Sequence, residues 1–133
     1  MSGHQLKIRV YYEDTDAAGI VYHASYLRFA ERGRTEMLRA AGIEHAKILA
    51  ETGIAFAVTS MTINFKAPAK LDDLLSVRTR ISGIRGASLQ MEQEIYREDR
   101  LLTTIALSLA CLDRRGKAAR LPEAIRTLFK SKA

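Results

Sequence analysis

Cysteine, tryptophan and proline are all scarce in this chain. The single cysteine, Cys111, cannot form an internal disulfide, so we expect a protein of the reducing cytoplasm. It lies in the apolar stretch SLACLD, which favours a small buried side chain over a reactive nucleophile. Tryptophan is absent, only two prolines occur, and the sequence contains no internal repeat and no low-complexity tract. The composition therefore argues against a disulfide-rich secreted domain and against a repeat protein.

Long hydrophobic runs are also missing. No stretch approaches the roughly 20 apolar residues that a membrane-spanning helix needs, so we expect no transmembrane segment. The opening stretch MSGHQLKIRV is polar and then alternating, and it lacks the apolar core of a secretory signal peptide. Apolar residues still make up 47% of the 133 residues, which is enough for the core of one folded domain across residues 1–133.

The charge of the chain is positive, with a formal net value of +6. A basic protein can bind nucleic acid, an anionic membrane or a phosphorylated ligand. Here the lysines and arginines are scattered among acidic residues, and no aromatic motif for stacking bases accompanies them. We therefore expect no nucleic-acid partner, a largely solvated charged surface and a few cations available for phosphates.

Hydrophobic periodicity divides the chain into strands and helices. Alternation predicts a strand at residues 6–12, and a helical period runs from Ser25 to Ala41, with Ser25 as the expected cap and Gly42 as the expected stop. The remaining expected elements are a short helix at 44–51, strands at 56–65, 74–82, 88–96 and 101–112, and a terminal helix after Pro122.

The order of these elements predicts an α+β fold. A first strand, a long helix and then four strands in a meander give a five-stranded antiparallel sheet wrapped around one central helix. Tyr26, Ala30, Gly33, Met37 and Ala41 share one face of that helix, and small residues on this face let it lie very close to the sheet. A sheet of this kind has open edges that a protein must cover or pair, so we expect at least a dimer.

The loop before the long helix reads EDTDAAGIVYH and carries the candidate chemistry. A structural interpretation has Asp14 or Asp16 making an Asx turn or capping a helical turn. A metal site built from Asp14, Asp16 and His23 matches no recognised ligand spacing, so we expect no metal. A catalytic interpretation places a carboxylate beside helix N–H groups that can hold an oxyanion, as acyl transfer requires. Spacing alone does not decide between the structural and the catalytic interpretations.

A longer run, YYEDTDAAGIVYHASYLRFAERGRTEML, resembles the signature of the 4-hydroxybenzoyl-CoA thioesterase-like branch of hotdog-fold proteins. It is most similar to the Tol-Pal system-associated acyl-CoA thioesterases. The similarity continues through FAVTSMTINFKAPAKLDDLL and IRGASL into LPEAI, so it covers nearly the whole chain. It implies the hotdog fold, homodimers or homotetramers with active sites between chains, and hydrolysis of acyl-CoA thioesters without a cofactor.

The resemblance also implies roles for individual residues. The catalytic aspartate of the family falls on Asp16, as nucleophile or general base, and the backbone N–H that polarises the thioester carbonyl falls on His23. Glu31 is the candidate for the helix carboxylate that other hotdog branches use, or for an ion pair with Arg28 or Arg34.

The CoA phosphates are expected near the hairpin IRGAS. There Arg85 would contact phosphate and Gly86 would admit close backbone approach, with help from Lys66. The alternative function is a non-catalytic hotdog module that binds acyl carrier protein or an envelope-associated partner.

Overall fold

A computed structural model describes residues 3–132 of the chain. Its elements are β1 (His4–Arg9), the 3₁₀ turn η1 (Tyr12–Asp14), α1 (His23–Ala40), α2 (His45–Thr52), β2 (Ala55–Phe65), β3 (Leu74–Arg85), β4 (Ser88–Arg97), β5 (Arg100–Leu112) and α3 (Glu123–Lys132). Every helix and strand that the sequence predicts is present. Within the described residues, no helix combines the length and the hydrophobicity needed to span a membrane.

The five strands form one antiparallel sheet, in the order β1-β3-β4-β5-β2. The predicted fold class is therefore confirmed, but the predicted four-strand meander is wrong. Only β3, β4 and β5 follow one another through tight hairpins, whereas β2 pairs with β5. The connection at residues 66–73 is too long for a hairpin, and it carries the chain from one edge of the sheet to a strand near the other.

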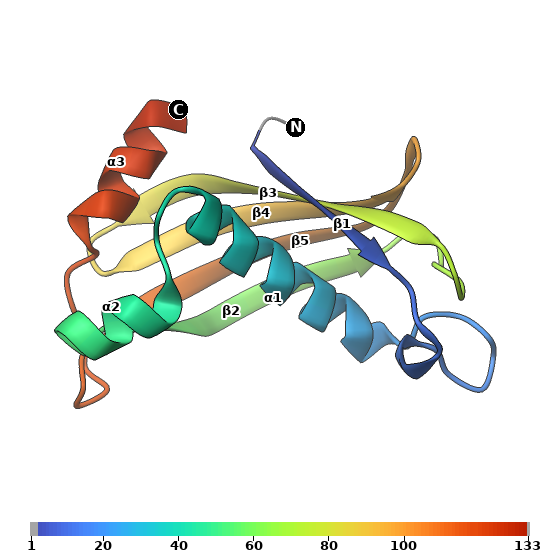
Figure 1. Ribbon diagram of the computed structural model, residues 1–133, viewed down its shortest axis with the longest axis horizontal. Coiled ribbons are helices and arrows are strands. Elements are labelled where there is room, and N and C mark those ends of the chain that lie inside the picture. Colours follow the sequence, from blue (N-terminus) through green and yellow to red (C-terminus); the bar gives the residue numbers. More distant parts are fainter. Residues whose placement is uncertain (1–2, 133) are drawn as a thin grey trace.

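The long helix α1 crosses one face of the sheet (Figure 1). It begins at His23, with Tyr22 at the cap position, so the prediction of Ser25 as the cap is wrong. Ser25 is instead buried in the first turn. At the other end, Gly42 adopts a φ of +83° and its N–H donates to the Arg39 carbonyl over 2.9 Å, which confirms the predicted stop. Ala41 is exposed, so the buried stripe ends earlier than expected.

Gly33 brings the middle of α1 against the sheet, as predicted. A Cβ atom on Gly33 would lie 2.6 Å from Val77 Cγ1 and 3.2 Å from Gln93 Nε2. This approach lets Gln93 Nε2 donate to the carbonyl of Ala30 over 2.8 Å, while Gln93 Oε1 accepts from the guanidinium of Arg34 over 3.0 Å. A buried glutamine of the sheet therefore fixes the helix at its midpoint, because burial makes its hydrogen bonds costly to lose.

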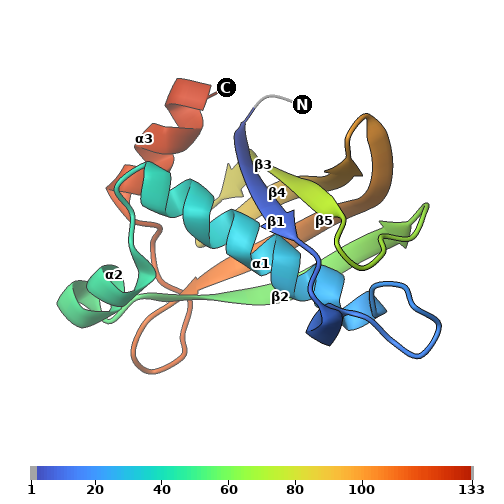
Figure 2. The same ribbon diagram turned by 45° about the vertical axis from the view of Figure 1, so that its right-hand side comes forward.

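The remaining helices lie at one end of the sheet and the loop before α1 at the other (Figures 1 and 2). Ile125 of α3 and Leu121, just before this helix, pack into the core, and Cys111 is fully buried as predicted. Burial raises the pKa of the Cys111 thiol, which suits a packing role. The sheet leaves β1 and β2 as its two edges, and β2 is the longer of them.

Candidate active site

The chain leaves β1 at Arg9 and folds into η1, so the first strand is shorter at this end than predicted. Asp14 explains this turn. Its carboxylate accepts the N–H of Tyr11 over 2.8 Å, and its carbonyl accepts the N–H of Tyr22 over 2.8 Å. Asp14 is also buried. The structural interpretation therefore applies to Asp14, which ties the two ends of the loop together.

Asp16 lies two residues further on, in a narrow turn that is closed by backbone hydrogen bonds. Its N–H donates to the Ile20 carbonyl over 2.9 Å, and its own carbonyl accepts from Gly19 over 3.0 Å. One carboxylate oxygen, Oδ1, accepts the N–H of Ala18 over 2.9 Å, which makes an Asx turn. The side chain is exposed, so the Asx turn holds its orientation while solvent, or a substrate, can still reach it.

His23 is the first residue of α1, and its side chain is exposed. Its ring packs against Tyr22, with ring centroids 4.4 Å apart. The first N–H groups of a helix have no carbonyl partner within the helix, and the cap residue Tyr22 supplies no side-chain acceptor. Among the hydrogen bonds of the described residues, none uses the N–H of His23. This N–H, at the positive end of the helix dipole, suits a developing oxyanion.

The connection at residues 66–73 lies against this loop. Ile20 forms an isolated bridge with Lys70, and the N–H of Val21 donates to the Ala69 carbonyl over 2.9 Å. Lys66, at the start of this connection, therefore lies at the same end of the molecule as Asp16 and His23. The contacts of this connection with the loop were not predicted from the sequence, although Pro68 and the paired aspartates Asp72 and Asp73 signal an ordered turn.

Arg85 and Gly86 lie at the opposite end of the sheet. They form the hairpin between β3 and β4, where Gly86 has a φ of +60°. β3 runs from Leu74, beside the loop, to Arg85, and its twelve residues span roughly 36 Å at about 3.3 Å per residue. Figure 1 shows the hairpin at the far end from the loop. One chain therefore does not bring Arg85 and Gly86 together with Asp16, whereas Lys66 lies at the Asp16 end.

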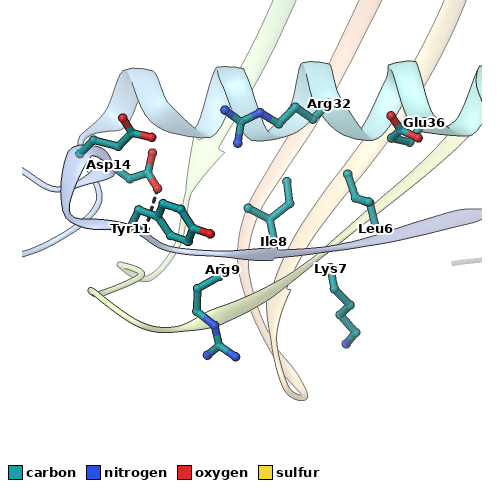
Figure 3. A pocket seen from close by; sticks show the side chains of 9 residues that line it. Leu6, Lys7, Ile8, Arg9, Tyr11, Asp14, Arg32 and Glu36 are labelled. Atoms are coloured by element: carbon teal, nitrogen blue, oxygen red, sulfur yellow. Dashed lines mark hydrogen bonds between the residues drawn. The ribbon is translucent and has the colours of Figure 1, made fainter.

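A pocket of about 440 Å³ opens between β1 and α1, and it contains neither Asp16 nor His23. Its lining residues are Leu6, Lys7, Ile8, Arg9, Tyr11, Glu13, Asp14, Arg32 and Glu36. Figure 3 shows Leu6 and Ile8 pointing toward α1, and Lys7 and Arg9 pointing away from it. The Asp14 carboxylate in this pocket is already engaged by Tyr11, as the dashed line in Figure 3 marks. We therefore assign the candidate chemistry to the exposed loop rather than to this pocket.

Glu31 is exposed on α1, and the ion pairs of the described residues do not include it, so its predicted ion pair with Arg28 or Arg34 is not formed. Arg34 is buried. Burial lowers the pKa of its guanidinium, and the charge of Glu31 raises it in part. Within the described residues, no cluster of three or more histidine, cysteine or acidic side chains is suited to hold a metal ion. The loop thus offers a carboxylate and backbone donors for its chemistry.

A family model described as the thioesterase-like superfamily matches residues 10–129 of this chain. The acyl-CoA thioesterase YbgC of Haemophilus influenzae is 41% identical over 129 residues, which cover 96% of this chain and 95% of that protein. The acyl-CoA thioester hydrolase YbgC of Escherichia coli is 46% identical over 125 residues, which cover 92% of each protein. The matched range of the family model contains every residue of the candidate site.

The solved structures give the same result for the fold. The crystal structure of a probable thioesterase from Bartonella henselae superposes with a TM-score of 0.88 at 42% sequence identity. The superposition covers 91% of this chain and all of that one. The likeness therefore extends over most of the fold.

Proposed function

Because the chain belongs to the thioesterase-like superfamily, we propose that it hydrolyses the thioester bond of acyl-CoA to a free acid and CoA. One observation carries this proposal beyond the family likeness. Asp16 is held with its carboxylate exposed, on a loop that leads directly into the free N-terminus of α1. Hydrolysis of a thioester needs this combination of a base or nucleophile and an oxyanion donor.

In the proposed reaction the thioester carbonyl accepts a hydrogen bond from the N–H of His23. Asp16 acts either as the nucleophile, forming an acyl-carboxylate anhydride that water then cleaves, or as the general base that removes a proton from the attacking water. Both routes break the bond between the carbonyl carbon and sulfur, and both release CoA as the leaving thiol. Loss of one oxyanion donor typically costs about 3 to 4 kcal/mol of activation free energy.

A second copy of this chain completes the proposed site. β2 is an eleven-residue edge strand, with Val58 and Phe65 about half exposed. An exposed edge of this length invites pairing with another strand. Antiparallel pairing of two β2 strands about a two-fold axis would place the carboxyl end of one β2 beside the amino end of the other.

This pairing has a consequence for the phosphate contacts. Phe65 and Lys66 lie at the Asp16 end of the molecule, whereas Ala55 pairs with Leu112 at the end that carries Arg85. A two-fold dimer would therefore bring Arg85 and Gly86 of one copy toward Asp16 of the other. The separation of these residues within one chain is what a site shared by two chains requires. A tetramer formed from two such dimers, and a cytoplasmic location, remain predictions from the sequence.

The alternative is a non-catalytic module that binds acyl carrier protein or an envelope-associated partner. Such a module would have no need of a carboxylate held open beside a helix N-terminus. The test is release of thiol from a panel of acyl-CoAs that differ in chain length and in aromatic character. Enzymatic turnover that Asp16→Asn abolishes supports hydrolysis. Retention of acyl carrier protein without any turnover would support the module instead.

A further inference from the structure

Ala69 contacts the chain on both sides of the start of α1. Its N–H donates to the hydroxyl oxygen of Tyr26 over 3.0 Å, and its carbonyl accepts the N–H of Val21 over 2.9 Å. Val21 lies two residues before His23, and Tyr26 lies three residues after it. One residue of the connection between β2 and β3 therefore clamps the segment that carries the proposed oxyanion donor.

The connection that supplies Ala69 is itself fixed to the sheet. Asp73 Oδ2 accepts the N–H of Lys70 and a guanidinium N–H of Arg97, each over 2.8 Å. The carbonyl of Asp73 accepts the N–H of Val10 over 2.9 Å, just after β1. Hydrogen bonds thus run from Arg97 of β4 through Asp73 to Lys70, the residue that follows Ala69 in the chain. Ala69 therefore has a fixed position against which the loop and the helix are held.

Tyr26 is suited to hold α1 at a fixed position relative to Ala69. Its side chain is buried, and its ring meets Phe29 and Phe65 edge-on, with centroid distances of 6.2 Å and 5.4 Å. Aromatic packing holds the ring, and the hydroxyl oxygen alone reaches the N–H of Ala69. Burial raises the pKa of this hydroxyl, although its hydrogen bond to Ala69 lowers it in part, so Tyr26 stays neutral at physiological pH.

We propose that Tyr26 is a positioning residue for thioester hydrolysis, whose hydroxyl, through Ala69, holds the N-terminus of α1 in register with the loop that carries Asp16. This inference rests on the proposed function for its catalytic consequence. Productive catalytic geometry tolerates displacements of only about 0.5 Å, and a misplacement of about 1 Å can cost a hundredfold in rate. Loss of the hydroxyl should therefore reduce turnover more than it reduces substrate binding.

Tyr26→Phe tests this inference because it removes one oxygen atom and keeps the ring. We expect kcat for an acyl-CoA to fall by about tenfold to a hundredfold, with KM changed less than about threefold, at a temperature well below the unfolding midpoint. We also expect faster hydrogen exchange in a peptide that covers residues 17–26. This second measurement does not depend on turnover.

Two control variants separate positioning from stability. Phe29→Leu disturbs the packing of the same ring but keeps the hydroxyl, so it should lower the unfolding midpoint while kcat stays within about threefold of wild type. Tyr96→Phe removes a hydroxyl from a half-buried tyrosine of β4, which stacks under Arg78, and should leave both quantities unchanged.

The outcomes are distinguishable. Near-normal kcat and unchanged exchange in Tyr26→Phe, or an equal loss of kcat in Phe29→Leu, would overturn the positioning role. If Tyr26→Phe does not fold, Asp73→Ala removes the acceptor of the Lys70 N–H and so loosens the neighbouring Ala69 from the opposite side. An unchanged kcat in that variant would overturn the positioning role as well. If the wild-type protein hydrolyses no acyl-CoA, the proposed function fails, and hydrogen exchange at residues 17–26 still decides whether Tyr26 fixes the loop.

Discussion

At the scale of single residues, Asp14 and Asp16 carry the same functional group in different surroundings. Asp14 is buried, and its carboxylate is used by the backbone of Tyr11. Asp16 is exposed, and among the hydrogen bonds of residues 3–132 its carboxylate accepts one, from the N–H of Ala18 to Oδ1. A free and oriented carboxylate oxygen is what a nucleophile or a general base requires, so we favour Asp16 for the chemistry and Asp14 for the turn.

The two aspartates provide a matched pair of variants. Asparagine keeps a side-chain oxygen that can accept the N–H of Ala18, so Asp16→Asn should preserve the Asx turn and lose only the charge. We expect turnover to fall at least a hundredfold, with the fold and the oligomer retained. Asp14→Asn, which can still accept the N–H of Tyr11, should keep near-normal turnover. Steady-state kinetics on one acyl-CoA, with circular dichroism, measures both. Equal losses in the two variants would argue against a special role for Asp16.

His23 allows backbone chemistry to be separated from side-chain chemistry. It occupies the first position of α1, where proline is well tolerated, and Tyr22 before it has φ −63° and ψ 136°, a conformation suited to precede proline. His23→Pro therefore removes the N–H while the helix is kept. We expect His23→Pro to lose about a hundredfold to a thousandfold in kcat, and His23→Ala to lose less than about tenfold.

The pH dependence of turnover completes this test. If the imidazole acts as acid or base, His23→Ala should remove a limb of the pH–rate profile near neutral pH, where an ordinary histidine titrates. If only the N–H acts, the profile of His23→Ala should keep its shape. A loss of kcat in His23→Ala as large as that in His23→Pro would show that catalysis depends on the side chain rather than on the backbone N–H.

At the scale of elements, the position of α1 depends on how closely it can approach the sheet. Alanine is a better helix former than glycine by about 1 kcal/mol. Gly33→Ala should nevertheless destabilise the protein, because the added Cβ would come within 2.6 Å of Val77 Cγ1 in a fully buried contact. We expect a loss of about 1 to 3 kcal/mol in the free energy of unfolding, from denaturant titration.

A double variant checks the cause of this loss. Val77→Ala alone should destabilise by leaving a cavity, but it also removes the methyl group that Gly33→Ala would strike. The double variant should therefore be more stable than the sum of the two single losses predicts. Simple additivity would mean that the contact between Gly33 and Val77 does not limit the approach of the helix.

The connection between β2 and β3 should make the protein sensitive to acid. Burial alone would raise the pKa of Asp73, but its hydrogen bonds from Arg97 and from the N–H of Lys70 outweigh burial and lower it. Because the pKa is lower in the folded state than in the unfolded chain, the carboxylate contributes stability above its ordinary value of about 4. This contribution is lost as the pH falls below that value.

The measurement is the unfolding midpoint as a function of pH. Wild type should lose stability between about pH 4 and pH 2, and Asp73→Asn should be less stable at neutral pH and show a flatter profile in that range. Asp99→Asn, at an exposed residue of the hairpin between β4 and β5, is the control and should follow wild type. A profile for Asp73→Asn that parallels wild type would show that Asp73 does not carry the acid sensitivity.

At the scale of the whole molecule, a site shared between two chains predicts complementation. Asp16→Asn removes the proposed catalytic group, and Arg85→Glu replaces the proposed phosphate contact with a repelling charge. Each homodimer should have low activity, because kcat falls in the first variant and KM rises in the second. In a mixed dimer, one site receives both substitutions and the other receives neither. Unfolding and refolding the two variants together should therefore restore activity, up to about a quarter of the wild-type value at random assortment.

Assembly itself can be disturbed at the edge strand. Val58→Glu places a charge on the exposed β2 edge and should shift the protein toward monomers with reduced turnover, whereas Gln5→Glu on the other edge strand, β1, should not. Light scattering at micromolar concentration measures the mass of each variant. A wild-type protein that is active as a monomer, or mixed variants that show no recovery, would argue against a shared site.

The sequence by itself determined most of the local structure. Alternation and helical periodicity predicted each strand and helix, and glycine predicted the end of α1 at Gly42, where a positive φ value is adopted. These features are local, since they depend on neighbours within a turn or along one strand. The predicted start of α1 was two residues late. A sequence reveals a helix start by a polar side chain that caps it, but here the cap residue Tyr22 makes no side-chain cap and its N–H donates to the carbonyl of Asp14.

Only the tertiary structure decided the remaining features. The pairing of β2 with β5 depends on which strands can meet after a long connection, and the local pattern of β2 is the same for either neighbour. The different roles of Asp14 and Asp16 follow from their burial, since Asp14 is buried and Asp16 is exposed. The separation of Arg85 from Asp16 is set by the length of β3, and the contact of Tyr26 with Ala69 joins residues 43 positions apart. Each of these features arises from packing between distant segments, which periodicity and composition do not encode.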